Sequence, residues 1–391
     1  MPFWPIAGHL RAMDLDLVYP AVSDLRAKAR RRIPHFAFEY LDSGTGAELQ
    51  VQRNRDALDA IHFMPDVLVG DVNPAWDTDF MGQSFSRPFG IAPIGMSGVM
   101  WPGAERILAQ AAARHSLPYC LSTVATKTPE DIAPHHGGMG WFQLYVPTEP
   151  DIRQDILKRA KEAGFTKLVF TLDVPDDSRR ERQRRAQLSL PPVITARTVW
   201  DIASHPRWAL ATLKEGKPSL KLADSYVEES KSRSSLAHAG HLIRGKPDWE
   251  TLARLREEWD GDLILKGVMD PALAKRLMAE GGDGIWVSNH GGRQFEPGPA
   301  AIDTLAAIRA ALPDAPLIFD SGIASGMDVL RALALGADFV MMGRAWHYAV
   351  SALGPEGPDH LVHILTEDMK LNMAQIGAHT LADLPRRLIR D

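Results

Sequence analysis

The chain has 391 residues, of which 45% are hydrophobic and 24% charged, and a formal net charge of −5. This balance excludes a disordered protein, and a mildly acidic chain has no general attraction to nucleic acid. The single cysteine, Cys120, excludes an intramolecular disulfide and a cysteine-based metal cluster, and we expect no metal site. Residues 1–5 lack signal-peptide features, and no apolar run reaches the ~18 residues of a membrane span, so we expect a cytoplasmic protein.

The first predicted elements in chain order are helices over 22–32 and 48–60, separated by Pro34 and a loop at 42–46. From residue 89 onward, short apolar runs alternate with amphipathic segments. The runs are apolar throughout, as strands buried on both faces should be. They lie at 89–95, 119–123, 141–146, 167–174, 263–268, 284–288, 317–322 and 339–343, and the clearest helical segments at 104–115, 151–163, 271–279, 301–312 and 327–335.

Eight strands in βα alternation over roughly 250 residues predict an α/β fold, a closed (β/α)8 TIM barrel. We place the barrel at about 89–350 within a single domain, 1–391, with N-terminal accessory helices. An open doubly wound sheet is the alternative. The absence of a Gly-x-Gly-x-x-Gly run opening a helix after the first strand weakens it.

A long excursion at about 195–245 interrupts the alternation after the fourth strand. It holds eight basic residues (197, 207, 214, 217, 221, 231, 233 and 244) against five acidic ones (201, 215, 224, 228 and 229), an excess of three positive charges on an acidic chain. It also carries Trp200, Trp208, Leu210, Leu213 and Leu220. Two interpretations stay open: a surface cover of the barrel mouth or a subunit contact, and a patch that docks on an anionic membrane.

Polar residues stand at the end of every predicted strand, where barrels of this kind build active sites. In strand order they are Pro93, Ile94 and Gly95; Ser122; Gln143 and Tyr145; Thr171 and Asp173, with Arg180 beyond; Lys266; Ser288, His290 and Arg293; Asp320, Ser321 and Gly322; and Gly343 and Arg344. Each has a structural explanation when taken singly, such as a helix cap or a solvated lysine. Together they predict a polar bowl. The glycine-bearing turns of the last two strands, with Arg344, predict a phosphate site, and a lysine beside a flat ring fits FMN.

The chain resembles the family of FMN-dependent L-2-hydroxy acid oxidases and dehydrogenases from end to end. The motifs that carry the resemblance lie at 38–44, 91–95, 121–123, 141–146, 172–175, 265–268, 319–322 and 342–344, and above all in the Ser-Asn-His-Gly-Gly-Arg-Gln run at 288–294. This last run is highly specific to the family.

The resemblance implies a role for each position. His290 would be the base and Asp173 would orient its imidazole, while Tyr145 would bond the substrate hydroxyl. Arg180, Arg293 and Tyr40 would bind the substrate carboxylate. Lys266 would sit beside the flavin ring. The backbone of Pro93, Ile94 and Gly95 would face the flavin. The ring, ribityl chain and phosphate would be held by Ser122, Gln143, Thr171, Ser288, Asp320, Ser321, Gly322, Gly343 and Arg344.

The sequence departs from the family pattern at several positions. Ala324 stands where many members have an arginine near the flavin, and Ser321 or Ser325 could compensate in part. Ser178 replaces a common glycine and follows Asp176 and Asp177. Val124 replaces the tryptophan of glycolate oxidase, which predicts a roomier pocket and leaves the particular hydroxy acid open.

Gly95 and the run at 205–208 resemble the membrane-associated dehydrogenases, so we expect electrons to pass to a quinone or another carrier. An O2-dependent oxidase is the alternative. A non-catalytic flavin-binding barrel and an isomerase are remoter ones. The resemblance also implies a homotetramer, and a peripheral position on the inner face of the cytoplasmic membrane.

Overall fold

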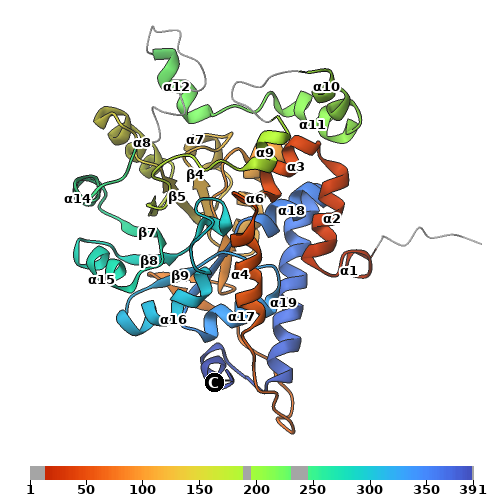
Figure 1. Cartoon of the computed structure of the whole chain (residues 1–391), viewed down its shortest axis with the longest axis vertical. Helices are drawn as coiled ribbons and strands as arrows, with labels where there is room; N and C mark the ends of the chain where they lie inside the picture. Colours follow the sequence, from red (N-terminus) through yellow and green to blue (C-terminus); the bar gives the residue numbers. More distant parts are fainter. Residues whose placement is uncertain (1–13, 188–194, 230–244, 390–391) are drawn as a thin grey trace, which may run out of the picture.

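The computed structural model describes residues 14–187, 195–229 and 245–389, and its centre is a closed barrel of eight parallel strands in the order β10-β3-β4-β5-β6-β7-β8-β9 (Figure 1). The predicted (β/α)8 barrel is confirmed, and the doubly wound sheet is wrong. Most strands end earlier than predicted, so the polar residues that follow them lie in loops at the barrel mouth. The strands are β3 (Phe89–Ile91), β4 (Tyr119–Ser122), β5 (Gly140–Leu144), β6 (Lys167–Thr171), β7 (Asp262–Val268), β8 (Gly284–Val287), β9 (Leu317–Phe319) and β10 (Phe339–Met342).

The helices alternate with the strands, and several begin at residues suited to a helix start. Asp270 caps α15, with Pro271 at its first position, and Ser325 accepts a hydrogen bond from the backbone of Asp328 at the start of α17. The helices are α1 (Leu15–Val18), α2 (Val22–Arg32), α3 (His35–Asp42), α4 (Leu49–Asp59), α5 (Ser97–Met100), α6 (Ala104–Arg114), α7 (Pro129–Ile132), α8 (Pro150–Glu162), α9 (Glu181–Arg185), α10 (Ala196–Ala203), α11 (Pro206–Glu215), α12 (Lys221–Glu229), α14 (Trp249–Glu258), α15 (Pro271–Ala279), α16 (Ala301–Ala311), α17 (Gly326–Ala334), α18 (Arg344–Leu353) and α19 (Gly357–Gln375), with short 3-10 turns at η1 (His290–Gly292), η2 (Gly354–Glu356) and η3 (Leu381–Arg386).

A hairpin that the sequence analysis did not predict covers the amino-terminal end of the barrel. Its strands, β1 (Thr78–Phe80) and β2 (Gln83–Phe85), place Phe80 and Phe85 against Trp141 and Phe339 of the barrel interior, with 5.2 Å between the ring centroids of Phe85 and Phe339. The Lys167 Nζ donates to the Met81 carbonyl at 2.8 Å. Because this end is filled, the functional site lies at the carboxyl ends of the strands.

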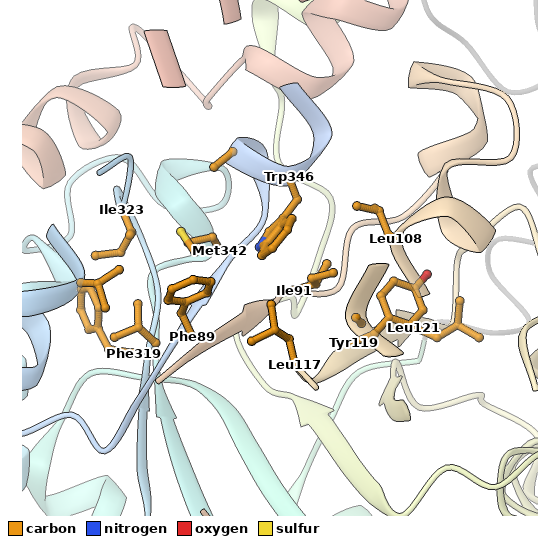
Figure 2. Close-up of a cluster of buried hydrophobic side chains, with 14 of the residues drawn as sticks. Phe89, Ile91, Leu108, Leu117, Tyr119, Leu121, Phe319, Ile323, Met342 and Trp346 are labelled. Atoms are coloured by element: carbon orange, nitrogen blue, oxygen red, sulfur yellow. The ribbon is translucent and has the colours of Figure 1, made fainter. Parts of the chain in front are cut away.

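The main core fills the space between the barrel and its surrounding helices. Figure 2 shows part of it, where Phe89 and Ile91 of β3 lie next to Trp346, and Tyr119 and Leu121 of β4 lie on the other side of Ile91. The Trp346 Nε1 donates to the Gly90 carbonyl at 3.0 Å. Burial of each large apolar side chain contributes about 1.5–3 kcal/mol, so this layer fixes the strand ends firmly.

The excursion follows the fourth barrel strand, as predicted, and α10 and α11 lie near α3 and α9 at the top of Figure 1. Trp208 of α11 is only 4% exposed; its Nε1 donates to the Val99 carbonyl at 3.0 Å, and its ring meets Phe36 of α3 edge-on at 5.8 Å. Trp208 and Leu220 are therefore core residues and not part of a surface patch. Residues 188–194 and 230–244 lie outside the described residues. In the described part of the chain, no helix combines the length and the apolar character that crossing a membrane requires.

Candidate active site

A histidine and an aspartate meet at the mouth of the barrel. The His290 Nδ1 lies 3.1 Å from Oδ1 and 3.2 Å from Oδ2 of Asp173, which follows β6. His290 itself adopts a left-handed backbone (φ 57°), and its N–H donates to the Ser288 Oγ at 3.0 Å. Burial lowers the pKa of His290 although Asp173 opposes this, so the imidazole is neutral at neutral pH. Burial alone would raise the pKa of Asp173, but its hydrogen bond with His290 and the charge of Lys266 hold it below its usual value, and this carboxylate is ionised.

The sequence analysis missed Gly267, which makes room for this pair. It has φ +96°, and a Cβ there would lie 2.5 Å from the Asp173 Cγ. The pairing of β7 with β8 shifts register between Lys266 and Val268, so Gly267 forms a local irregularity in β7. A glycine inside a strand that is predicted to be buried was the available signal.

Lys266 lies at the centre of a buried polar network. Its Nζ donates to the Ser288 Oγ at 2.7 Å and to the Asp320 Oδ2 at 2.9 Å, and lies 4.9 Å from the centroid of the Trp286 ring. Asp320 also accepts from the Ser321 hydroxyl at 2.8 Å. A cation held this way can stabilise negative charge on a ligand above the barrel.

Three polar side chains connect β4, β5 and β6 beside that network. The Ser122 hydroxyl donates to the Gln143 Oε1 at 2.8 Å, and the Gln143 Nε2 donates to the Thr171 Oγ1 at 3.0 Å. All three residues are buried. Their amide and hydroxyl groups suit the polar edge of a planar heterocycle.

The predicted carboxylate ligands gather near the end of α3. The Arg293 Nη1 donates to the Ser43 carbonyl at 2.9 Å and its Nη2 to the Tyr40 carbonyl at 2.9 Å, with the guanidinium 5.6 Å from the Tyr40 ring centroid. Burial, with the like charges of Arg180 and Arg344, lowers the pKa of Arg293, so an anion beside it is favoured. Arg180 donates to the Ser178 Oγ at 2.9 Å and to the Gln294 Oε1 at 3.0 Å.

The loop after β3 holds the predicted flavin-facing residues Pro93, Ile94 and Gly95. The Tyr40 hydroxyl donates to the Gly95 carbonyl at 3.0 Å. A Cβ at position 95 would lie 2.5 Å from the Val124 Cγ2, so Val124 occupies the space directly beside Gly95. Tyr145 directly follows β5, and its N–H donates to the Thr123 Oγ1 at 3.0 Å.

The loops after β9 and β10 form the predicted phosphate end. Gly322 has φ +97°, and a Cβ on Gly343 would lie 2.8 Å from the Ile94 Cδ1, so side chains are excluded from both turns. Arg344 donates to the Gly291 carbonyl at 2.8 Å, and its buried Nε has no hydrogen-bond partner among the described residues. A partly buried guanidinium whose Nε lacks a partner, placed between glycine turns, fits a phosphate.

The residues that depart from the family pattern lie at the following places in the structure. Ala324 is exposed, and its N–H donates to Asp328 at 3.0 Å. Ser321 and Ser325 do not replace a cation, because Ser321 donates to Asp320 and Ser325 caps α17. Asp176 and Asp177 are exposed, and Asp176 lies 3.6 Å from the Lys246 Nζ.

Comparisons with known proteins agree with this geometry. A family model described as FMN-dependent dehydrogenase matches residues 29–391. The chain is 36% identical to an L-lactate dehydrogenase of Pectobacterium atrosepticum, covering 94% of this chain and 96% of that one. It is 35% identical to an (S)-mandelate dehydrogenase of Pseudomonas putida, covering 93% and 92%. A solved structure of (S)-mandelate dehydrogenase, described as a monotopic membrane protein, has a TM-score of 0.89 at 34% identity and covers 95% of this chain and 100% of its own.

Proposed function

We propose that this chain, which belongs to the family of FMN-dependent dehydrogenases, oxidises a lactate- or mandelate-like L-2-hydroxy acid to the 2-oxo acid. Its cofactor is FMN, and it is an oxidoreductase. The observation that carries the substrate class is the His290–Asp173 pair at the same barrel mouth as Arg180, Arg293 and Tyr40.

Oxidation of a 2-hydroxy acid removes two electrons and two protons, and His290 is the group placed to take a proton. Its Nδ1 faces Asp173, so its Nε2 is the nitrogen directed to the substrate. Asp173 stabilises the imidazolium that forms. Arg180 and Arg293 hold the carboxylate, with Tyr40 beside it, and Tyr145 bonds the hydroxyl oxygen.

FMN would supply the acceptor of the two electrons and of the second proton when it is bound, and the described residues fit it. The orphaned Arg344 Nε and the turns at Gly322 and Gly343 suit its phosphate. Ser122, Gln143 and Thr171 suit the ring edge, and Lys266 suits the part of the ring where charge develops.

The test is anaerobic reduction of the purified yellow protein by L-lactate and by L-mandelate. Bleaching of the flavin absorbance is expected, and the His290→Ala variant should keep its colour under the same conditions. A wild-type protein that binds FMN and is not bleached by any L-2-hydroxy acid would reject the proposal.

For the electron acceptor we infer a quinone or another carrier. The support is Gly95, which resembles the dehydrogenases of the family, and an alanine methyl group at this position would meet the Val124 side chain at 2.5 Å. The O2-dependent alternative is separated by admitting air after bleaching: slow return of colour with fast return on adding a quinone supports the carrier, and fast return in air supports an oxidase. The homotetramer stays a prediction.

We also infer that the excursion attaches the protein to the cytoplasmic face of a membrane. On α10 and α11, Trp200, Leu210 and Leu213 are 76%, 66% and 81% exposed, and five exposed basic residues lie on these helices or shortly after them in the chain (Arg197, Arg207, Lys214, Lys217 and Lys221). Apolar side chains among basic ones suit an anionic lipid surface.

Sedimentation with phosphatidylglycerol vesicles tests this attachment. Replacing Trp200, Leu210 and Leu213 with serine should release the protein from vesicles while reduction by the hydroxy acid continues. Leu371→Ser, at a side chain that is 63% exposed on α19, is the matched control and should sediment like the wild type. Unchanged sedimentation of the triple variant would reject the attachment.

A further inference from the structure

The support of Arg180 is unusual for a residue that must hold a substrate. Arg180 has a left-handed backbone (φ 43°) and immediately precedes α9, a helix of five residues. No residue of α9 is buried, so no apolar packing fixes this helix. Its position therefore depends on polar contacts.

Arg182 supplies such contacts with three carboxylates. Its Nε donates to the Glu39 Oε2 at 2.6 Å, its Nη2 to the Asp42 Oδ2 at 2.9 Å, and its Nη1 to the Glu48 Oε2 at 3.0 Å. Glu39 and Asp42 are each only 6% exposed. Figure 1 shows α9 beside α3, which carries both of these residues. A planar guanidinium that uses all three of its nitrogens fixes orientation as well as distance.

Two of these three carboxylates, Asp42 on α3 and Glu48 directly before α4, are themselves held in place. Asp42 also accepts from the Arg26 Nε at 2.5 Å and from the Tyr348 hydroxyl at 2.7 Å, and Glu48 accepts from the Gly44 N–H at 2.7 Å. Arg182 therefore ties α9 to a rigid junction of α2, α3 and α18.

The same junction holds the other predicted carboxylate ligands. Tyr40 lies between Glu39 and Asp42 on α3, and the carbonyls of Tyr40, Leu41 and Ser43 accept from Arg293. The end of α3 thus binds Arg293 through its carbonyls and Arg182 through its carboxylates. The end of α3 therefore contributes to the distance between Arg180 and Arg293, in addition to the bond from Arg180 to Gln294.

We propose that Arg182 is a positioning residue, which fixes Arg180 relative to Arg293 and Tyr40 through its bonds to Glu39, Asp42 and Glu48. This inference rests on the proposed function, in which those residues bind the substrate carboxylate. Arg182 does not touch the substrate in this assignment. It sets the geometry of the anion site and leaves the chemistry at His290 unchanged.

The test compares Arg182→Lys with Arg185→Lys in the FMN-loaded enzyme. Lysine keeps the charge but presents its donors from a single nitrogen, so it loses the planar geometry in which three separate nitrogens each reach one carboxylate. Arg185 makes the matched control, because it is an exposed arginine of the same helix. For Arg182→Lys we expect KM for the hydroxy acid to rise about tenfold, as for the loss of ~1.4 kcal/mol, with kcat within about twofold to threefold and the Kd for FMN unchanged. Arg185→Lys should match the wild type.

A second measurement distinguishes the positioning role of Arg182 from the proposed function. The Kd of oxalate, an unreactive dicarboxylate, follows from its perturbation of the flavin spectrum without turnover, and Arg182→Lys should weaken it by about the same factor. Unchanged oxalate affinity and KM would overturn the positioning role while leaving the proposed function standing. A fall in kcat and FMN affinity at constant KM would overturn the positioning role as well.

If Arg182→Lys does not fold, a second variant replaces it. Glu39→Gln weakens one of the three bonds and should likewise raise KM while kcat stays nearly unchanged. A wild-type enzyme that binds oxalate but is not reduced by hydroxy acids would reject the proposed function alone.

Discussion

Asp173 and His290 are 117 residues apart in the chain, and the barrel brings the His290 Nδ1 to 3.1 Å from the Asp173 carboxylate. The two follow strands β6 and β8, and the strand between them contributes Gly267, which leaves the space that Asp173 fills. The base His290, its partner Asp173 and the space left by Gly267 thus belong to three consecutive strands. The barrel orients the two side chains, so we expect that a substitution in the pair changes the reaction rate and leaves the fold intact.

Asp173→Asn should lower the rate of flavin reduction by about 10²–10⁴-fold, because the imidazolium loses its counter-charge. The carboxylate raises the pKa of His290 against the effect of burial. Its removal should therefore move the acidic limb of the pH–rate profile to lower pH while the plateau falls. Anaerobic stopped-flow reduction across pH 5–9 measures both. Asp176→Asn, at an exposed aspartate nearby, is the control, and a plateau at the wild-type rate would contradict the assigned role of Asp173.

Lys266→Met should lower the midpoint potential of bound FMN by on the order of 30 mV or more, which is ~1.4 kcal/mol for a two-electron couple. The reason is that the Lys266 ammonium favours negative charge above the barrel mouth. Lys167→Met is a matched control, because Lys167 is also a buried, paired lysine but lies at the opposite end of the barrel. Anaerobic redox titration measures the potentials. Equal shifts of the midpoint potential in both variants would show that the loss of any buried, paired lysine has this effect and that the position of Lys266 beside the flavin does not cause it.

The barrel could be predicted because its signal is local. Each strand is a short apolar run and each helix an amphipathic segment, and strand order follows from chain order in this fold. The polar residues at strand ends could be found for the same reason. Ser122, Gln143 and Thr171 needed no information beyond their place at the ends of adjacent strands, and the structure joins them by hydrogen bonds.

What could not be predicted depends on contacts between distant segments. The bonds from Arg182 to Glu39 and Asp42 span 143 and 140 residues, and nothing in the sequence near Arg182 marks its partners. Trp208 was wrongly grouped with the surface residues Trp200 and Leu210, because helical periodicity does not reveal which face another helix covers. The hairpin at the barrel base was missed because its strands have only three residues each.

Ala324→Arg should tighten FMN binding. The turn after β9 presents no cation from position 324, and Ser321 and Ser325 are used elsewhere. An arginine at this exposed position adds a charged donor near the phosphate end, which we expect to lower the Kd for FMN about tenfold. Fluorescence titration of apoprotein with FMN measures this. Ala324→Met is the control for side-chain length, and an equal gain in both variants would show that charge is not the cause.

The final prediction concerns the stability of the enzyme in mild acid, which we expect to depend on His347. This histidine is 1% exposed in α18, and its Nε2 lies 2.8 Å from the Ser97 Oγ, while its Nδ1 donates to the Gly343 carbonyl at 2.9 Å.

Burial lowers the pKa of His347 to about 4. In the unfolded chain a histidine titrates near ~6.5. Between these values the unfolded chain binds a proton that the folded chain does not, so stability falls as the pH drops from about 6.5 toward about 4. Over that window the loss amounts to about 3 kcal/mol.

His347→Leu removes this titration, so the variant should lose about 2 kcal/mol less than the wild type between pH 7.5 and pH 5. Its stability at pH 7.5 can be lower, because Ser97 and Gly343 lose a partner, but the pH dependence is the quantity that decides. Urea unfolding of the FMN-loaded protein at the two pH values measures it, and comparison within the pair of proteins cancels the other titrating groups. His363→Leu, at a half-exposed histidine of α19, is the control for the loss of an imidazole from a helix surface. If wild type and His347→Leu lose equal stability in acid, the imidazole of His347 is not held neutral by the fold.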